Sequence, residues 1–220
     1  HLSCGPAWPW NEKDQFEAYS KYKTKRKIFH NCSGKHCGHL AVCQYKNLPI
    51  KNYQNKEHSI QKDLIQLIDD LSKYKIKNVG VDGCTLPNPL IPLKKFAFAT
   101  AQLADYKKLN VHSVIAKRIF DSCVKFPEIA GGSKSINSIL TKLANGKVFV
   151  KNGAEGIFVA IIPEKKSALA VKIIDGAARA AEVAIVGLLS ELKIINNEKI
   201  KKRPIKNSAG QIIGSMKWIC

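Results

Sequence analysis

The stretch KVFVKNGAEGIFVAIIPEKKSALAVKII, residues 147–174, decides the fold class. It contains three apolar runs rich in β-branched residues, at 147–151, 156–162 and 168–174, and turn-forming residues separate them. Short runs of this kind, bounded by Gly, Asn and Pro, are typical of strands joined by tight turns. The stretch therefore predicts an antiparallel meander.

Helices are predicted on both sides of this meander along the chain. A small-residue helix follows it over 175–193, and a last run at 211–218 is expected to return as an edge strand. Before it, capping residues and apolar spacing predict helices over 11–24, from 31 or 33 to 43, from Ser59, over 93–106 and over 111–124, a short strand at Val79–Val81 and a loop at 130–133. This order predicts an α+β domain with an antiparallel sheet flanked by helices.

The chain is strongly basic, with 220 residues, a formal net charge of +19 and a pI near 9.7. Such a charge raises nucleic acid as a partner. The excess is almost entirely Lys, however, whereas base readout and bidentate phosphate binding favour Arg. Nucleic acid is therefore not the expected partner. No apolar run is long enough to predict a transmembrane helix, so no membrane partner is expected.

Seven cysteines are irregularly spaced along the chain. A disulfide framework is usually even in number and denser, so the set predicts free thiols in a reducing cytoplasm. Cys43 and Cys123 lie on apolar helical faces, where packing explains them. Cys32 and Cys84 lie in Gly-containing loops, where packing explains them less well.

The stretch Asn31-Cys32-Ser33-Gly34-Lys35-His36-Cys37-Gly38-His39 is the strongest candidate for chemistry. Thiolates combined with nitrogen donors suit a four-coordinate zinc site, and Cys84 could add a second thiol. Lys35 and His36 follow Cys32 by three and four residues, so either could point to the same side of a helix. A helix with solvated histidines is the alternative interpretation. A zinc finger is not the expected site, because no second Cys/His pair repeats a short spacing.

A second candidate is Lys151-Asn152-Gly153, at the start of a predicted strand. It nearly matches the Lys-Thr-Gly or Lys-Ser-Gly motif of penicillin-recognising serine hydrolases, which also carry a Ser-x-x-Lys nucleophile. Ser-x-x-Lys occurs five times here, as expected by chance in so lysine-rich a chain. None of these copies has the apolar setting that would make its lysine a base.

Six sequence blocks, spread over essentially the whole chain, occur in the same order as in a known protein family. The chain resembles the L-asparaginase II family, the Rhizobium etli-type or thermolabile L-asparaginases. The blocks are Cys4-Gly5-Pro6-Ala7-Trp8-Pro9, Asn31-Cys32-Ser33-Gly34-Lys35-His36, Gly80-Val81-Asp82-Gly83-Cys84, Pro127-Glu128-Ile129-Ala130-Gly131, Lys151-Asn152-Gly153-Ala154-Glu155-Gly156 and Lys172-Ile173-Ile174-Asp175-Gly176-Ala177-Ala178-Arg179.

The resemblance implies an amidohydrolase that converts L-asparagine to aspartate and ammonia, on a fold like that of serine β-lactamases and glutaminases. It implies zinc held by Cys32, Lys35 and Cys84, and a catalytic role for Lys151. It also implies a homodimer when the protein is full length. Substrate-binding residues are not assigned, since Asn137-Ser138 stands where relatives carry Asp-Thr.

In this family the Ser-x-x-Lys block precedes the Cys-Gly-Pro segment, which lies at residues 4–6 here. We therefore expect residues 1–220 to be the C-terminal portion of an N-terminally truncated family domain, inactive alone because the catalytic serine lies upstream. A basic zinc-containing module for nucleic acid is the alternative, and a decayed protein that retains only the fold is a third hypothesis.

Overall fold

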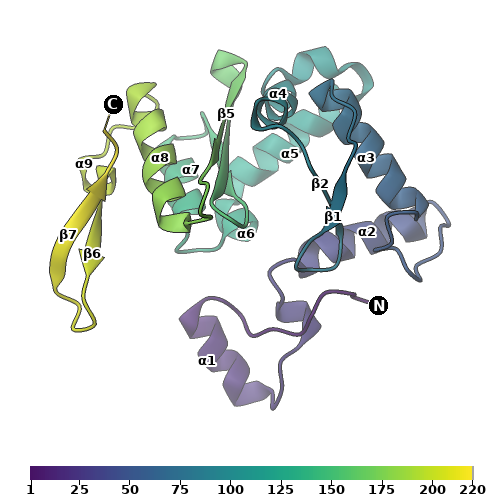
Figure 1. Ribbon diagram of the computed structural model, residues 1–220, viewed down its shortest axis with the longest axis horizontal. Coiled ribbons are helices and arrows are strands. Elements are labelled where there is room, and N and C mark those ends of the chain that lie inside the picture. The colour runs from purple at the N-terminus through teal and green to yellow at the C-terminus, as the bar shows by residue number, and fades with distance from the viewer. Residues whose placement is uncertain (220) are drawn as a thin grey trace. The chain divides into compact units, whose positions relative to one another are not determined.

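The computed structural model describes residues 1–219, apart from the side chain of Val111; Cys220, one of the seven cysteines, lies outside the described residues. The chain divides into two compact units (Figure 1). We call His1–Ile91 the N-terminal unit and Pro92–Cys220 the C-terminal unit. Helices and antiparallel strand pairs occur in both, so the predicted α+β class is confirmed.

The N-terminal unit is mostly helical. Its elements are α1 (Glu12–Lys21), η1 (Lys27–Phe29), α2 (Ser33–Tyr45), α3 (Ser59–Ser72), β1 (Val79–Val81) and β2 (Pro87–Pro89). Asn11 caps α1 as predicted, because its side chain accepts hydrogen bonds from the Lys13 and Asp14 amides. The predicted cap of α2 was wrong: Cys32 occupies that position and makes no side-chain capping bond.

The two short strands of this unit form an antiparallel hairpin, in which Val79 pairs with Pro89 and Val81 with Pro87. Only the first strand was predicted, since Pro is depleted in strands. The core of the unit is small and includes three thiols. Its buried members are Cys4, Cys43, Tyr53, Ile60, Cys84 and Leu86. The loop that joins β1 to β2 is thus anchored in the core through Cys84 and Leu86.

The C-terminal unit carries the predicted meander. Its elements are α4 (Leu93–Ala104), η2 (Tyr106–His112), α5 (Ser113–Lys125), α6 (Pro127–Gly131), α7 (Ile136–Leu143), β3 (Phe149–Asn152), β4 (Ile157–Ile162), η3 (Pro163–Lys165), β5 (Ser167–Lys172), α8 (Ala178–Glu191), α9 (Glu198–Lys201), β6 (Lys202–Lys206) and β7 (Ile212–Lys217). Part of the predicted 130–133 loop is helical, because α6 extends to Gly131. Helix α7 was not predicted.

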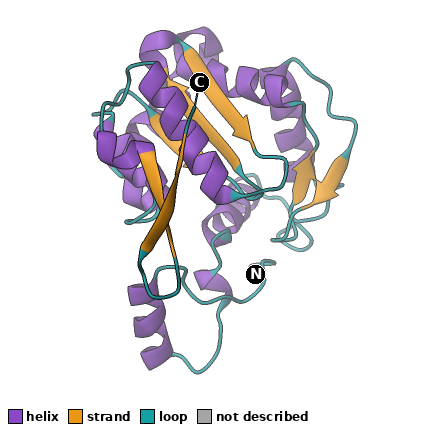
Figure 2. Cartoon of the chain, turned by 60° about the vertical axis from the view of Figure 1, so that its left-hand side comes forward, coloured by secondary structure: helices purple, strands orange, loops and turns teal. Residues whose placement is uncertain are grey.

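Strands β3, β4 and β5 form one antiparallel sheet in chain order, so the meander is confirmed. Phe158, Ala160 and Ile162 alternate along β4 and pack in one core cluster with residues of α7 and α8. Helix α4 also contacts β4 and β5, and Figure 2 shows helices on either side of the strands. The prediction of a sheet flanked by helices therefore holds within this unit.

The last two strands form a separate antiparallel hairpin, with Arg203 opposite Met216. The predicted edge strand at 211–218 thus pairs with β6, not with the three-stranded sheet. Trp218 follows the hairpin and lies against Gly187 of α8. Among the described residues, no helix combines the length and apolarity that crossing a bilayer would require.

Candidate metal centre and lysine site

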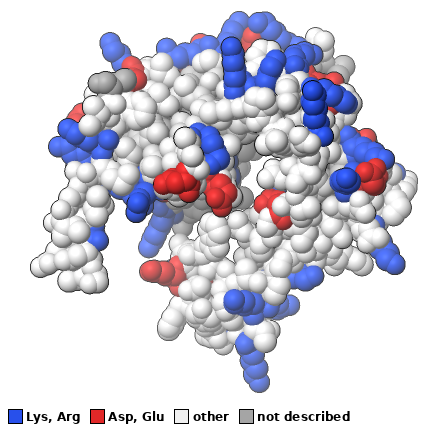
Figure 3. All heavy atoms as spheres, in the orientation of Figure 1, with Lys and Arg blue, Asp and Glu red and all other residues white. Residues whose placement is uncertain are grey.

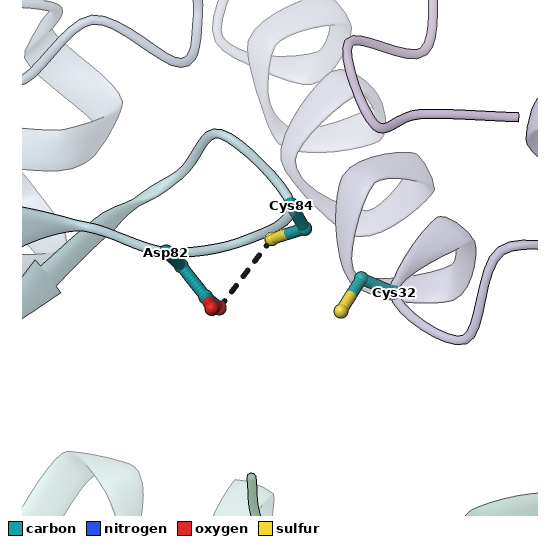
Figure 4. A group of neighbouring side chains, drawn as sticks. All are labelled: Cys32, Asp82 and Cys84. Carbon is teal, nitrogen blue, oxygen red and sulfur yellow. Dashed lines mark hydrogen bonds between the residues drawn. The ribbon is translucent and has the colours of Figure 1, made fainter. Parts of the chain in front are cut away.

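Three side chains converge in the N-terminal unit, as Figure 4 shows. Cys32 lies at the start of α2, whereas Asp82 and Cys84 belong to the loop between β1 and β2. The two sulfur atoms and a carboxylate oxygen all lie within 4.8 Å of one another. Residues separated by about fifty positions in the sequence therefore present their potential ligand atoms at one place.

Local hydrogen bonds give the loop its shape. The Asp82 amide donates to the Leu86 carbonyl at 2.8 Å, and the Thr85 amide donates to the Asp82 carbonyl at 2.8 Å. The Gly83 amide donates to Asp82 Oδ1 at 2.7 Å, which leaves Oδ2 for the cluster. Cys84 Sγ donates to this Oδ2 at 3.5 Å. The tight turn thus holds the thiol and the carboxylate side by side.

Lys35 extends its amine to the same place. Its Nζ lies 3.2 Å from Asp82 Oδ2 in a partly exposed ion pair. Burial alone would lower the pKa of Lys35, but the hydrogen bond to Asp82 and the electrostatic effects of the neighbouring Cys84 and Cys32 outweigh burial and raise it. In the absence of a cation, Lys35 is therefore an ammonium group that neutralises Asp82.

The pKa values of Cys32 and Asp82 are shifted in opposite directions. Burial raises the pKa of the Cys32 thiol, and the neighbouring Cys84 raises it further, while Lys35 acts against both. Burial would also raise the pKa of Asp82, but the hydrogen bond and charge of Lys35 prevail and lower it. The site thus combines an ionised carboxylate with a thiol that favours its protonated form.

This donor set fits a divalent transition metal. Two soft thiols with one nitrogen and one oxygen donor match the four-coordinate sites that zinc prefers. Cys32, Lys35 and Cys84, the predicted ligands, are brought together. Asp82 was missed as a potential ligand, although its place two residues before Cys84 in a turn was visible. A cation would displace the ammonium proton of Lys35 and the thiol protons.

The histidines next to Cys32 take a different role. His36 is completely buried and is absent from the converging group, so the alternative of solvated histidines is wrong for this residue. His39 is half-buried, and its Nδ1 lies 3.0 Å from the side-chain amide of Gln61. Neither ring presents a nitrogen to the two thiols.

In the C-terminal unit, Lys151 lies on β3 and is half-buried. Its Nζ donates to the backbone carbonyl of Asn152 at 2.8 Å and to Asn152 Oδ1 at 3.0 Å. Asn152 is itself held, because Asn137 Nδ2 donates to its Oδ1 at 2.7 Å and Asn137 Oδ1 accepts from its amide at 3.0 Å. The amine of Lys151 is thus anchored on a side chain whose orientation a buried neighbour fixes.

The start of α7 also holds the loop that precedes it. Ser138 is buried, and its hydroxyl lies within hydrogen-bonding distance of the carbonyl oxygens of Pro127, at 2.9 Å, and Gly132, at 2.7 Å. A Cβ added to Gly131 would lie 2.8 Å from the Cβ of Asn137, so only Gly fits there. Asn137 and Ser138 therefore fix both the Gly131 loop and Asn152.

On the face drawn in Figure 3 the positive charge is mixed with negative charge. Figure 3 shows Lys and Arg spread over the face drawn, with several beside Asp or Glu. Among the described residues, Lys46 pairs with Asp63 and Lys62 with Glu57. The hypothesis of a basic nucleic-acid module thus gains no support from the described residues.

The family comparison agrees with the sequence blocks, whereas no curated protein matches the chain. The family comparison matches residues 1–218 to L-asparaginase II, which is essentially the whole chain. The chain therefore belongs to the L-asparaginase II family.

Proposed function

We propose that the protein is a zinc-dependent amide hydrolase that converts L-asparagine and water to aspartate and ammonia. Membership of the L-asparaginase II family supports the reaction class. The observation that carries the zinc proposal is the convergence of Cys32, Asp82 and Cys84 within 4.8 Å, with the amine of Lys35 on Asp82. Free thiols with irregular spacing also support the proposed cytoplasmic location.

Cys32, Cys84 and Lys35 would hold the metal, with Asp82 as a further donor or as a proton acceptor beside it. Zinc in such a site supplies Lewis-acid polarisation. The protein residues themselves fix the positions of the donor atoms and balance the charge of the site. The β1–β2 turn holds the Cys84 thiol beside the Asp82 carboxylate, and this carboxylate neutralises Lys35 when no cation is present.

Lys151 is the proposed catalytic residue of the C-terminal unit. An ammonium group there would orient the carboxylate of an amino-acid substrate, or stabilise the negative charge that develops on the amide oxygen. Asn152 and Asn137 hold its Nζ in place. We further propose that the sheet and its flanking helices are related to serine β-lactamases and glutaminases. In this scheme a Ser-x-x-Lys segment upstream of His1 supplies the nucleophile.

The test measures ammonia release from asparagine and zinc content on the same purified, reduced sample. Cys32→Ala and Cys84→Ala are expected to lose zinc, whereas Cys43→Ala and Cys123→Ala, at thiols outside the cluster, retain it. Lys151→Ala is expected to keep zinc. Wild-type protein without zinc, or cluster variants that retain it, would refute the ligand assignment.

The location of the nucleophile is tested separately. We expect residues 1–220 to bind zinc but to release no ammonia. A protein that adds the upstream family segment in trans or by fusion should release ammonia, and Lys151→Ala should abolish that activity. Ammonia release by residues 1–220 alone would place the nucleophile within them.

A further inference from the structure

A buried polar network lies behind the thiol cluster. His36 of α2 is fully inaccessible and Tyr53 is 1 % exposed, and His36 Nδ1 lies 2.6 Å from the Tyr53 hydroxyl oxygen. His36 follows Cys32 by one helical turn, and its amide donates to the Cys32 carbonyl at 3.1 Å. The network therefore starts from the same helical turn that presents the first thiol.

The hydrogen-bond partners of Tyr53 favour one state of the His36 ring. Tyr53 Oη accepts from the Ser3 amide at 3.0 Å, and an amide can only donate. The hydroxyl hydrogen of Tyr53 is therefore available for His36 Nδ1. A neutral imidazole that accepts at Nδ1 carries its hydrogen on Nε2. His36 thus presents an N–H group on the side of the ring away from Tyr53.

That N–H group is buried, and no hydrogen bond of acceptable geometry reaches it. An unpaired buried donor is costly, so native structures rarely leave one. The backbone carbonyl of Cys84 lies close enough to oppose the effect of burial, which lowers the pKa of His36. This carbonyl is therefore the acceptor that a small movement of the β1–β2 loop would bring to Nε2.

The loop residue after Cys84 is strained and is held by the same network. Thr85 has φ of 80°, a left-handed conformation that is rare for a β-branched residue. Such a conformation persists where the surroundings impose it. The Thr85 hydroxyl oxygen lies 3.0 Å from Ser3 Oγ, which in turn donates to Tyr53 at 3.1 Å. The network therefore contacts the Cys84 loop at Thr85, the residue next to Cys84.

We propose that Tyr53 and His36 are positioning residues for cation binding: Tyr53 orients His36, whose Nε2–H meets the Cys84 carbonyl after a small movement of the β1–β2 loop and sets the Cys84 thiol opposite Cys32. This inference rests on the metal site of the proposed function. It assigns a role to two residues that contribute no ligand atom. Outer hydrogen bonds of this kind commonly change metal affinity by about 10–100-fold.

The test uses Co²⁺, whose thiolate and ligand-field absorption bands report on the geometry of the site. Tyr53→Phe keeps the ring but removes the hydroxyl, and Tyr45→Phe makes the same change at a residue that is 87 % exposed on the same helix as Cys32. We expect Tyr53→Phe to weaken Co²⁺ binding about 10–100-fold and to shift the ligand-field bands. Tyr45→Phe should change neither.

A second pair of variants separates positioning from packing. His36→Gln keeps a side-chain N–H donor, whereas His36→Leu removes it. We expect His36→Gln to retain much more of the wild-type affinity and spectrum than His36→Leu. Thermal unfolding of each metal-free variant shows whether the fold is retained. Equal losses in His36→Gln and His36→Leu would overturn the positioning role.

The outcomes distinguish this inference from the metal proposal. Wild-type protein that binds Co²⁺ through thiolates, with Tyr53→Phe equal to wild type, refutes the inference and leaves the metal site standing. Wild-type protein that shows no thiolate-to-cobalt band refutes the metal site, and the positioning role with it.

Discussion

Gly187→Ala on α8 tests how the C-terminal hairpin is held, and it reverses the usual effect of this substitution. A Gly-to-Ala change inside a helix normally stabilises a protein by about 1 kcal/mol. Here a Cβ at residue 187 would lie 2.1 Å from Cγ and 2.4 Å from Cβ of Trp218. Carbon atoms pack at about 3.5 Å or more, so the indole would have to move by about 1.4 Å.

The expected magnitude follows from these two opposing effects. Forcing an extra methyl group into a packed contact costs about 1–3 kcal/mol. After the helix-propensity gain, Gly187→Ala should therefore lower the free energy of unfolding by about 0–2 kcal/mol. In a Trp218→Ala background the methyl group meets no indole, and the same substitution should stabilise the protein by about 1 kcal/mol.

The assay is urea unfolding of the wild type, both single variants and the double variant, followed by far-ultraviolet circular dichroism. The double-mutant cycle gives the coupling energy between residues 187 and 218 directly. We expect a coupling of about 1–3 kcal/mol. If Gly187→Ala stabilises both backgrounds equally, Trp218 does not pack against α8 and the reasoning fails.

Three further predictions concern stability. Asp69→Asn should make the free energy of unfolding fall less steeply in acid. Burial would raise the pKa of Asp69, but hydrogen bonds from Lys75 and the Ile76 amide lower it. The Asp69 carboxylate therefore stabilises the fold above its unfolded pKa of about 3.9, and this stabilisation is lost as the pH falls through the folded pKa. Urea unfolding from pH 7 to pH 2 checks this, and parallel curves for variant and wild type would contradict it. Phe158→Ala should lower the free energy of unfolding by about 3–5 kcal/mol, because this side chain is 2 % exposed in the main core. Val159 is half-buried, so Val159→Ala should lower the free energy of unfolding clearly less in the same urea unfolding experiment. Asn137→Ala should lower the free energy of unfolding by about 1–3 kcal/mol, because it leaves the Asn152 amide without its acceptor. Ile139→Ala, on the exposed side of α7, is the control. Equal effects of the two substitutions in thermal unfolding would count against the Asn137 bond.

Local sequence patterns predicted the helices and strands that are determined by residues close together in the sequence. The meander could be predicted because turn residues separate three β-branched runs, and α1 could be predicted because Asn11 can cap it. Helix α7 escaped prediction, because the Gly131-Gly132 pair before it indicated a loop. The Ser135 side chain nevertheless caps α7 by accepting from the Ser138 amide. Caps of this kind are visible only when the following apolar run is recognised as helical.

The candidate site could be predicted only in part, because it depends on contacts between distant segments. The family resemblance indicated Cys32, Lys35 and Cys84, and the structure places Cys32 and Cys84 together. Asp82 was not predicted, since a carboxylate in a turn usually makes only local bonds and its approach to Cys32 depends on the fold. No periodicity indicates that His36 is buried, since its partner Tyr53 lies in a loop between α2 and α3.

Cys84 belongs both to the small core of the N-terminal unit and to the thiol cluster, and this dual position has an energetic consequence. A cation that binds the folded state stabilises it in proportion to the logarithm of its concentration over its dissociation constant. Bound between Cys32 and Cys84, the cation would cross-link α2 to the β1–β2 loop, the two segments that close this core. Metal affinity and the stability of the N-terminal unit are therefore coupled, and a substitution that loosens the Cys84 loop weakens both.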